Sequence, residues 1–451
     1  MVVALALIGL HQSTAGAVRE QKGKEPRIGN TGPFPRNVYA WRVTFRVVPA
    51  GEVEYRPWSP SPWTILVVVA GLLGVVIGLG IAAFVPRGAV GNDEYVLWKW
   101  EANTLLDNAF ARFGIGSTPT RSEGETALTQ YFKLTSEIRA AEQTDNPNLD
   151  LLDTLTNERA TYENDVERLV EGYITEAVDS AGLERSLPLF RSKKITWPPV
   201  DFELTNPPQL LVRSPRNEIR REGDTLLKPD LSLRDIENLE AKTTNKDTVS
   251  IVVSIGGLAA YPAIVRDDRS YDSLLDTASH EWVHHYLAFY PLGEQWGKGG
   301  DAETLNETTA SIAGQQIAAL IRQAHPQQLP AGEDGRAPAT PAPTVDFNKE
   351  MQSLRTQVDA LLKDGKVTEA EQLMDEKRQY LADHGITIRK INQAYFAFYG
   401  TYADLPQSSN PIGPKIEQVW EKTQDVGVFL KLMREVRTVD DLDKTLAALG
   451  G

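Results

Sequence analysis

The pattern of apolar and polar positions separates one long uncharged segment from a series of amphipathic elements. Residues 63–85 read WTILVVVAGLLGVVIGLGIAAFV and carry no charged side chain. At about 1.5 Å per residue, a helix of this length crosses the hydrocarbon core of a bilayer, which is about 30 Å thick. The four glycines of the segment would weaken a soluble helix but are common in membrane spans. The pattern therefore predicts one transmembrane helix at residues 63–85.

Beyond this segment the chain begins with helical periodicity. Apolar residues recur at steps of three and four through residues 127–141 and 149–181, and an Asn-Pro-Asn sequence separates the two stretches. This pattern predicts a helical hairpin within residues 93–190.

From residue 197 the pattern becomes mixed. Two longer amphipathic stretches, residues 272–289 and 302–322, predict helices. Short β-branched runs bounded by proline or glycine predict strands at residues 200–204, 209–212 and 248–255. Together these elements predict a core of residues 197–328 that contains one small sheet.

The remaining chain returns to helices. Residues 329–344 (LPAGEDGRAPATPAPT) are rich in proline, alanine and glycine, which is typical of a linker. Residues 345–451 predict a C-terminal helical region, beginning with a second hairpin at residues 346–383 that turns at Gly365. The predicted fold class is α+β and helix-rich, with a small sheet flanked by helical hairpins after the single transmembrane helix.

The composition excludes several kinds of catalytic and metal-binding site. The chain of 451 residues contains no cysteine, which excludes disulfides, thiolate zinc sites, iron–sulfur clusters and cysteine nucleophiles. It contains six histidines, so a metal ion would need His, Asp or Glu ligands. The net charge of −14 argues against a nucleic-acid partner, because phosphate binding requires a basic surface.

Charge also bears on the orientation of the predicted span. Residues 1–62 form a basic tail, with eight Lys and Arg residues against four Glu residues. A basic flank favours the cytoplasmic side, which predicts a single-pass membrane protein with its large C-terminal part outside the cytoplasm. Two observations keep the opposite orientation open. The basic residues closest to the span are equal in number on both sides, and residues 1–10 are apolar like part of a signal peptide.

A cluster of histidines provides the candidate metal-binding residues. His280, Glu281 and His284 form an H-E-x-x-H sequence. Residues four apart lie on one face of a helix, one turn apart, so both imidazoles can bind one ion. A carboxylate directly after the first ligand can hold a water molecule at that ion and accept its proton. The pattern predicts one zinc ion per chain with Glu281 as the base. His285, turned about 100° from His284, is expected to be a core or surface residue.

A third ligand is expected downstream, because catalytic zinc has three protein ligands and one open position. There the chain reads DAETLNE at residues 301–307. The H-E-x-x-H sequence and the Asn-Glu pair on the next helix resemble the glutamate-zincin metallopeptidases, the thermolysin-like and zinc-aminopeptidase-like group. The resemblance, which covers roughly residues 248–322, implies peptide bonds as the substrate. It also implies that His280, His284 and Glu307 bind zinc and that Glu281 is the catalytic base.

The spacing keeps a second glutamate open as the third ligand. Eighteen residues separate His284 from Glu303, as in the aminopeptidase-like members, whereas twenty-two separate it from Glu307. Asp301 is a predicted N-cap, which would place Glu303 in the first helical turn, where the helix dipole favours an acid in any case. We therefore expect Glu307 to bind the metal, with Glu303 close enough to orient a ligand histidine.

Two further expectations follow from the resemblance. Peptidases of this group bind the substrate backbone along an exposed strand, and residues 248–255 with the glycines that follow lie where that strand would be. An ordinary strand ending in a turn explains the same residues equally well. The group also places a Tyr or His near the oxyanion, and among the three tyrosines of residues 392–402 we name Tyr395.

The leading hypothesis is a membrane-anchored zinc metallopeptidase that acts on a peptide or protein substrate. Exopeptidase and endopeptidase activity both fit the motif, and no oligomeric state follows from the sequence. The alternative is a membrane-tethered interaction scaffold of helical hairpins with a structural or degenerate metal site. The intact Glu281 favours the enzyme, because a structural site needs no base.

Overall fold

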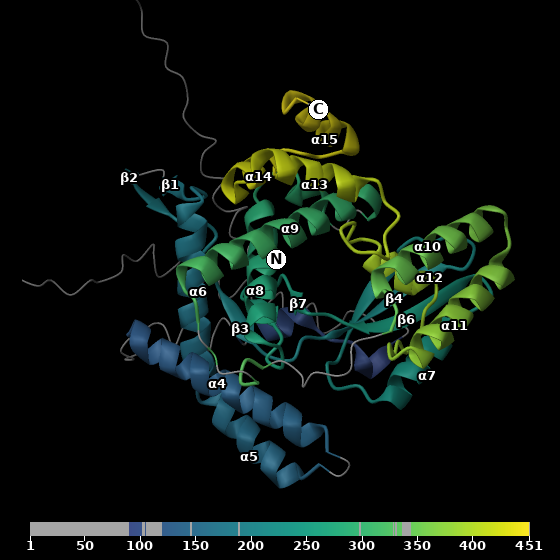
Figure 1. The fold of residues 1–451 in the computed structure, drawn as a ribbon, viewed down its shortest axis with the longest axis horizontal. Coiled ribbons are helices and arrows are strands. Elements are labelled where there is room, and N and C mark those ends of the chain that lie inside the picture. The colour runs from purple at the N-terminus through teal and green to yellow at the C-terminus, as the bar shows by residue number, and fades with distance from the viewer. Residues whose placement is uncertain are drawn as a thin grey trace, which may run out of the picture. The chain divides into compact units, whose positions relative to one another are not determined.

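The computed structural model describes residues 90–104 and 120–450 (Figure 1). Within these ranges, residues 102–103, 145–146, 188–189 and 297–298 and most of residues 328–343 are not described. The predicted basic tail and transmembrane helix lie outside the described residues. Among the residues that are described, no helix is both long enough and apolar enough to cross a membrane. The described residues belong to one compact unit of the chain, residues 87–451.

The fold is helix-rich α+β, as predicted, but it has two three-stranded sheets in place of one. In the first sheet the order is β3 (Phe202–Leu204), β8 (Ala263–Val265), β7 (Gly257–Leu258). Strand β8 is parallel to β3 and antiparallel to β7. In the second sheet the order is β5 (Gly223–Leu227), β4 (Gln209–Pro215), β6 (Thr248–Ser254), and both pairs are antiparallel.

The prediction of a single sheet is wrong because the chain changes sheet twice. Pro207 and Pro208 separate β3 from β4, and a proline has no N–H group to donate to a strand ladder. The second change of sheet occurs at Ile255 and Gly256, which separate β6 from β7. Each interruption ends one strand and lets the next one pair in the other sheet.

The second sheet carries helices on both faces. Alternate residues of β4 point to opposite sides, as strand geometry requires. Leu210 and Val212 belong to the second core cluster, whereas Leu211 belongs to a smaller cluster with residues of α7 (Leu233–Thr243). The second core cluster joins this sheet to α10 (Phe347–Lys363), α11 (Val367–Asp383) and α12 (Gln393–Tyr399). Helices α10 and α11 form the predicted hairpin, which turns at Gly365 with a φ of 75° that glycine adopts without strain.

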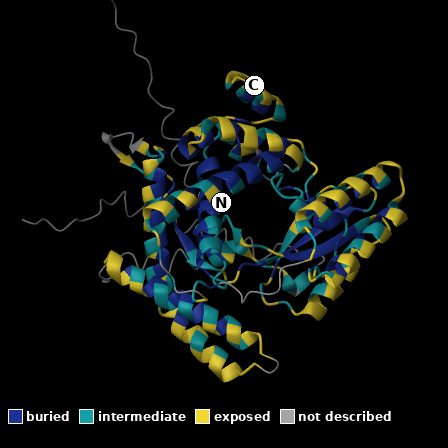
Figure 2. Cartoon of the chain, in the orientation of Figure 1, coloured by how far each residue is buried: buried dark blue, intermediate teal, exposed yellow. Residues whose placement is uncertain are grey.

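The first core cluster is centred on α8 (Tyr271–Leu287) and α9 (Gly300–Ala324). Both match the helices predicted at residues 272–289 and 302–322, and Figure 2 shows them buried over most of their length. Ser270 caps α8 by accepting a hydrogen bond from the N–H of Ser273. The helices packed around this pair are α6 (Glu163–Ser180), α13 (Ile412–Thr423) and α14 (Val426–Met433), with α15 (Val439–Ala448) on α13.

The N-terminal helical region differs from the prediction at one point. The helix predicted at residues 149–181 is two helices, α5 (Leu149–Ala160) and α6, because the chain turns at Thr161 and Tyr162. The turn leaves Arg159 at the end of α5, where its buried side chain lies 2.6 Å from the Asp267 carboxylate. This ion pair fastens α5, and with it α4 (Arg121–Glu142), to the segment that precedes α8. A two-stranded hairpin of β1 (Arg185–Leu187) and β2 (Phe190–Ile195) follows α6.

Candidate metal centre

Helix α8 brings two histidines to one point. His280 and His284 lie one turn apart, and their Nε2 atoms are 2.9 Å apart. The side chain of His284 is 2% exposed and that of His280 is 18% exposed. The four-residue spacing of the two histidines therefore brings both Nε2 atoms to the same small volume, as the sequence predicts.

Helix α9 adds a carboxylate to the pair. Glu307 Oε2 lies 3.5 Å from His280 Nε2 and 3.3 Å from His284 Nε2. One potential ligand atom from each residue lies within 4.8 Å of the other two. Among the described residues, His280, His284 and Glu307 are the group of acidic and imidazole side chains close enough to share a metal ion.

The two helices approach this closely because α9 has a glycine where they meet. A Cβ atom placed on Gly314 would lie 2.8 Å from the backbone nitrogen of His280 and 2.9 Å from its Cα. Both distances are shorter than van der Waals contact. A larger residue at this position would separate the helices and, with them, Glu307 from the histidines.

The donor set fits a divalent cation. Bonds of about 2.0–2.1 Å at tetrahedral angles place neighbouring ligand atoms about 3.3 Å apart. The three separations between the ligand atoms are 2.9, 3.3 and 3.5 Å. Zinc and several other first-row metal ions accept two imidazoles and a carboxylate. The three residues thus form a possible metal site, and their geometry alone does not select the ion.

Hydrogen bonding sets the tautomer of His284. Its Nδ1 lies 2.8 Å from Asn306 Oδ1, and Asn306 Nδ2 donates to the carbonyl of Leu292 at 3.4 Å, so the amide oxygen faces the ring. Nδ1 therefore carries the proton, and Nε2 presents its lone pair to the site. Burial by itself would raise the pKa of Glu307, but the two imidazoles, when they are protonated, hold it far below its usual range, so this carboxylate is ionised.

The competing ligand, Glu303, is engaged elsewhere. It lies one turn before Glu307, and its Oε1 accepts a hydrogen bond from Arg221 Nη1 at 2.5 Å. Arg221 also pairs with Asp224, and its guanidinium lies 5.5 Å from the centre of the Phe398 ring. Glu303 therefore belongs to an ion-pair cluster that links α9 to the connection between β4 and β5. The structure brings Glu307 to the histidines, as the Asn-Glu pair indicated.

Glu281 is buried beside an outer strand of the first sheet. A Cβ atom placed on Gly257 would lie 2.5 Å from Glu281 Oε1, so β7 passes directly against this carboxylate. Burial raises the pKa of Glu281 above its usual value. The strand that lies against Glu281 is thus β7, whereas residues 248–254 form β6 of the other sheet.

His285 makes no part of the ligand group, in agreement with its expected role. Its Nε2 donates to the carbonyl of Ala260 at 2.5 Å, and its ring centre is 5.3 Å from that of Tyr261. Burial lowers the pKa of His285 to about 4, so the ring is neutral in the folded protein near pH 7. It packs the end of α8 against the segment that follows β7.

Tyr395, the tyrosine named from the sequence, lies in the second core cluster. Its ring packs against those of Phe396 and Tyr399, with centres 5.5 and 4.6 Å away. Its hydroxyl lies 3.5 Å from Gln407 Nε2. These contacts are those of a packed aromatic residue on α12.

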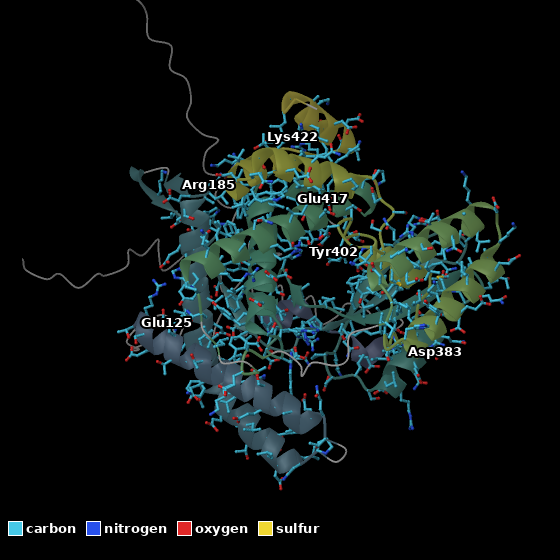
Figure 3. The ribbon with its side chains drawn as sticks, in the orientation of Figure 1. Glu125, Arg185, Asp383, Tyr402, Glu417 and Lys422 are labelled. Atoms are coloured by element: carbon cyan, nitrogen blue, oxygen red, sulfur yellow. The ribbon has the colours of Figure 1, made fainter. Side chains whose placement is uncertain are left out.

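Tyr402 lies at the candidate centre instead. It follows α12, in the region between α9 and α12 (Figure 3), and its ring centre is 6.4 Å from that of His280. Burial, followed by the charges of Glu307 and Glu281, raises the pKa of the Tyr402 hydroxyl well above its usual value. The hydroxyl is therefore protonated and able to donate a hydrogen bond.

Sequence reasoning missed three neighbours of the ligands, namely Asn306, Trp296 and Tyr402. Asn306 had a signal, because it directly precedes Glu307 in the Asn-Glu pair. Tyr402 had one as well, because it is one of the three tyrosines of residues 392–402, whereas Trp296, in the connection between α8 and α9, had none. The ring of Trp296 lies 4.1 Å from that of His284, centre to centre, and covers one side of it.

Comparisons with known proteins assign no family to this chain. No family model matches it, and neither a curated protein nor a solved structure matches it. The resemblance to glutamate zincins therefore rests on the residues of α8 and α9. What the structure establishes is a helix-rich α+β fold with a possible metal site formed by His280, His284 and Glu307.

Proposed function

We propose that the protein is a zinc metallopeptidase. The observation that carries the proposal is the convergence of His280, His284 and Glu307 with a fourth, buried side chain, Glu281, beside them. A structural metal site needs no carboxylate at this position, whereas metal-assisted hydrolysis needs a base within reach of the ion.

Each residue of the site has a separate role in the proposed hydrolysis. His280, His284 and Glu307 would hold the zinc ion, which would supply Lewis acidity for a water molecule and for the peptide carbonyl. Glu281 takes the proton of the attacking water on a carboxylate oxygen and later gives it to the nitrogen of the leaving amine. Asn306 keeps the His284 ring in the tautomer that binds through Nε2.

A peptide is the substrate class that suits the surroundings of Glu281. In the described sheet, β7 is an outer strand that pairs with β8 on one side. Gly257 has no side chain, so the backbone of β7 runs close to Glu281. An extended peptide added along β7 would bring its carbonyl groups next to Glu281 and the ligands.

The direct test of the proposed function is metal-dependent cleavage. Full-length protein loaded with zinc is incubated with peptides of varied length, with and without EDTA, and the products are identified by mass spectrometry. We expect cleavage that stops on chelation and returns when zinc is supplied again. Zinc should also stabilise the fold by about 4 kcal/mol when the free ion is at about 1,000 times its Kd. A protein that binds zinc tightly and cuts no peptide would support the scaffold with a structural site.

Tyr402 is assigned the hydrogen bond to the oxygen of the attacked carbonyl. We expect Tyr402→Phe to lower kcat by about 100-fold, because one donor to the developing oxyanion is lost. Zinc content should not change, since no ligand is altered. The matched control is Tyr395→Phe, which removes a hydroxyl from the same part of the chain and should leave kcat unchanged. A kcat that falls in Tyr395→Phe and not in Tyr402→Phe would return this role to Tyr395.

We also propose that residues 63–85 anchor the enzyme in a membrane, with the large C-terminal part outside the cytoplasm. The support is the uncharged length of this segment and the basic residues that precede it. Full-length protein should stay in the membrane fraction after an alkaline wash, and protease added to intact cells should digest the C-terminal part. Release by alkali would contradict the anchor, and protection from the protease would contradict the orientation.

A further inference from the structure

The face of α9 that meets α8 follows the whole length of the His280 side chain. Gly314 lies against the backbone and Cβ of His280, where a Cβ atom on the glycine would be 2.8–3.1 Å away. Glu307, two turns earlier on α9, meets Nε2 of the same imidazole at 3.5 Å. Ser311 lies between these two residues on the same helical face. Ser311 therefore lies on α9 between the residue that approaches the backbone of His280 and the residue that approaches its Nε2.

Ser311 holds a carboxylate from a distant loop at this level. Its Oγ donates to Asp404 Oδ2 at 2.7 Å. The other oxygen, Asp404 Oδ1, is buried and has no hydrogen-bond partner in the part of the chain that the structure describes. Leaving a buried acceptor unsatisfied costs about 1–3 kcal/mol, and more for a charged group. A donor for Oδ1 is therefore expected close by.

His280 has the complementary requirement. A histidine that binds a metal ion through Nε2 carries a proton on Nδ1, and that proton is almost always donated to a carboxylate, a carbonyl or water. His284 meets this requirement with Asn306. Asp404 is one of the carboxylates whose negative charge acts on His280, so it lies within electrostatic range of this side chain.

We propose that Asp404 is a positioning residue for the metal centre, whose Oδ1 accepts the Nδ1 proton of His280. This bond fixes the imidazole with Nε2 towards the ion and strengthens Nε2 as a ligand. The inference rests on the zinc site of the proposed function but not on peptide hydrolysis. It gives each ligand histidine its own acceptor, Asn306 from α9 and Asp404 from the loop after α12.

The loop that carries Asp404 is held in place by other contacts as well. Thr308 Oγ1 accepts a hydrogen bond from the backbone N–H of Ala403 at 3.0 Å. Further along the loop, Ser409 Oγ donates to Asp359 Oδ2 at 2.8 Å, on α10. Removing the charge of Asp404 should therefore leave the loop attached. The Ser409–Asp359 pair also supplies a matched control, because it is a second Ser–Asp hydrogen bond on the same loop.

The test measures the zinc affinity of the full-length protein by competition with a chromophoric chelator. Asp404→Asn keeps the shape of the side chain without its charge, and Asp404→Leu removes both acceptors. We expect zinc binding to weaken by about 10-fold in Asp404→Asn and by up to about 100-fold in Asp404→Leu, the range found for such outer partners. Asp359→Asn should bind zinc like the wild type. The visible spectrum of the Co²⁺-loaded Asp404→Asn variant should also shift, because the ligand strength of His280 changes.

The possible outcomes separate this inference from the peptidase itself. Wild-type zinc affinity in both Asp404 variants would overturn it, and so would a loss of affinity in Ser311→Ala alone, because Ser311 would then be the acceptor. Zinc affinity does not depend on cleavage. A wild type that binds zinc but cuts no peptide would therefore remove the proposed activity and leave the role of Asp404 intact. A wild type that binds no zinc would overturn both.

Discussion

Replacing Glu281 with glutamine is expected to lower kcat by about 1,000-fold or more while zinc stays bound. The amide cannot accept a proton from water, and loss of a general base of this kind costs about 4 kcal/mol of transition-state stabilisation. Glutamine has the shape of glutamate, so it fits against Gly257 without moving β7. His280, His284 and Glu307 keep their contacts. The measurements are kcat on a peptide that the wild type cuts and the zinc content of the same preparation.

A matched control for this variant is Glu294→Gln. Glu294 lies on the connection between α8 and α9, where it pairs with Arg437 at 2.8 Å, so the substitution makes the same chemical change outside the site. Its kcat should equal that of the wild type. Hydrolysis at the wild-type rate by Glu281→Gln would refute the assigned base. Loss of zinc from that variant would instead show that Glu281 shapes the metal site.

The second large effect concerns the metal itself. We expect about one zinc ion per chain in the wild type, because one site with this set of ligands binds one ion. His280→Ala, His284→Ala and Glu307→Ala should each carry almost none after desalting, because two protein ligands hold zinc far less tightly than three. Elemental mass spectrometry gives the stoichiometry, and circular dichroism shows that each variant is folded.

Glu303→Ala separates the two candidates for the third ligand. Glu303 lies one turn before Glu307 and bonds Arg221, so its loss removes an ion pair and leaves the three ligand atoms in place. Zinc content should therefore remain near one per chain. The opposite pattern, with zinc lost in Glu303→Ala and kept in Glu307→Ala, would reverse the assignment of the third ligand.

The centre could be predicted from the sequence as far as it depends on helix geometry. His280 and His284 are neighbours because a helix returns to the same face after four residues. The Asn-Glu pair predicts Glu307 rather than Glu303 as the third ligand, and Glu307 is the carboxylate that lies beside both histidines. Two hydrogen bonds give a physical reason for this arrangement. The Glu303 carboxylate accepts one from Arg221, and Asn306, the neighbour of Glu307, accepts one from His284. Arg221 lies 82 residues before Glu303, and no local sequence pattern relates the two.

What the sequence did not predict depends on contacts between distant segments. Hydrophobic periodicity indicated the strands but not their division into two sheets, since pairing partners are not encoded in the period of a single strand. Tyr395 and Tyr402 belong to the same aromatic run, but α12 ends at Tyr399, and Tyr402 lies beyond that end with its ring near that of His280. Asp404 lies in a loop without regular secondary structure and accepts a hydrogen bond from Ser311 of α9, which is 93 residues earlier in the chain.

The distance along the chain between the ligands and Tyr402 has a consequence for the protein during its own synthesis. All three ligands have been translated once Glu307 is added, whereas Tyr402 and Asp404 follow roughly 100 residues later. At about 5–20 residues per second this is a delay of about 5–20 s. On the proposed mechanism, a nascent chain that already has its metal ligands lacks the residue that stabilises the oxyanion. The growing chain would thus be a peptidase with kcat about 100-fold below that of the folded protein until residues 402–404 have docked on α9.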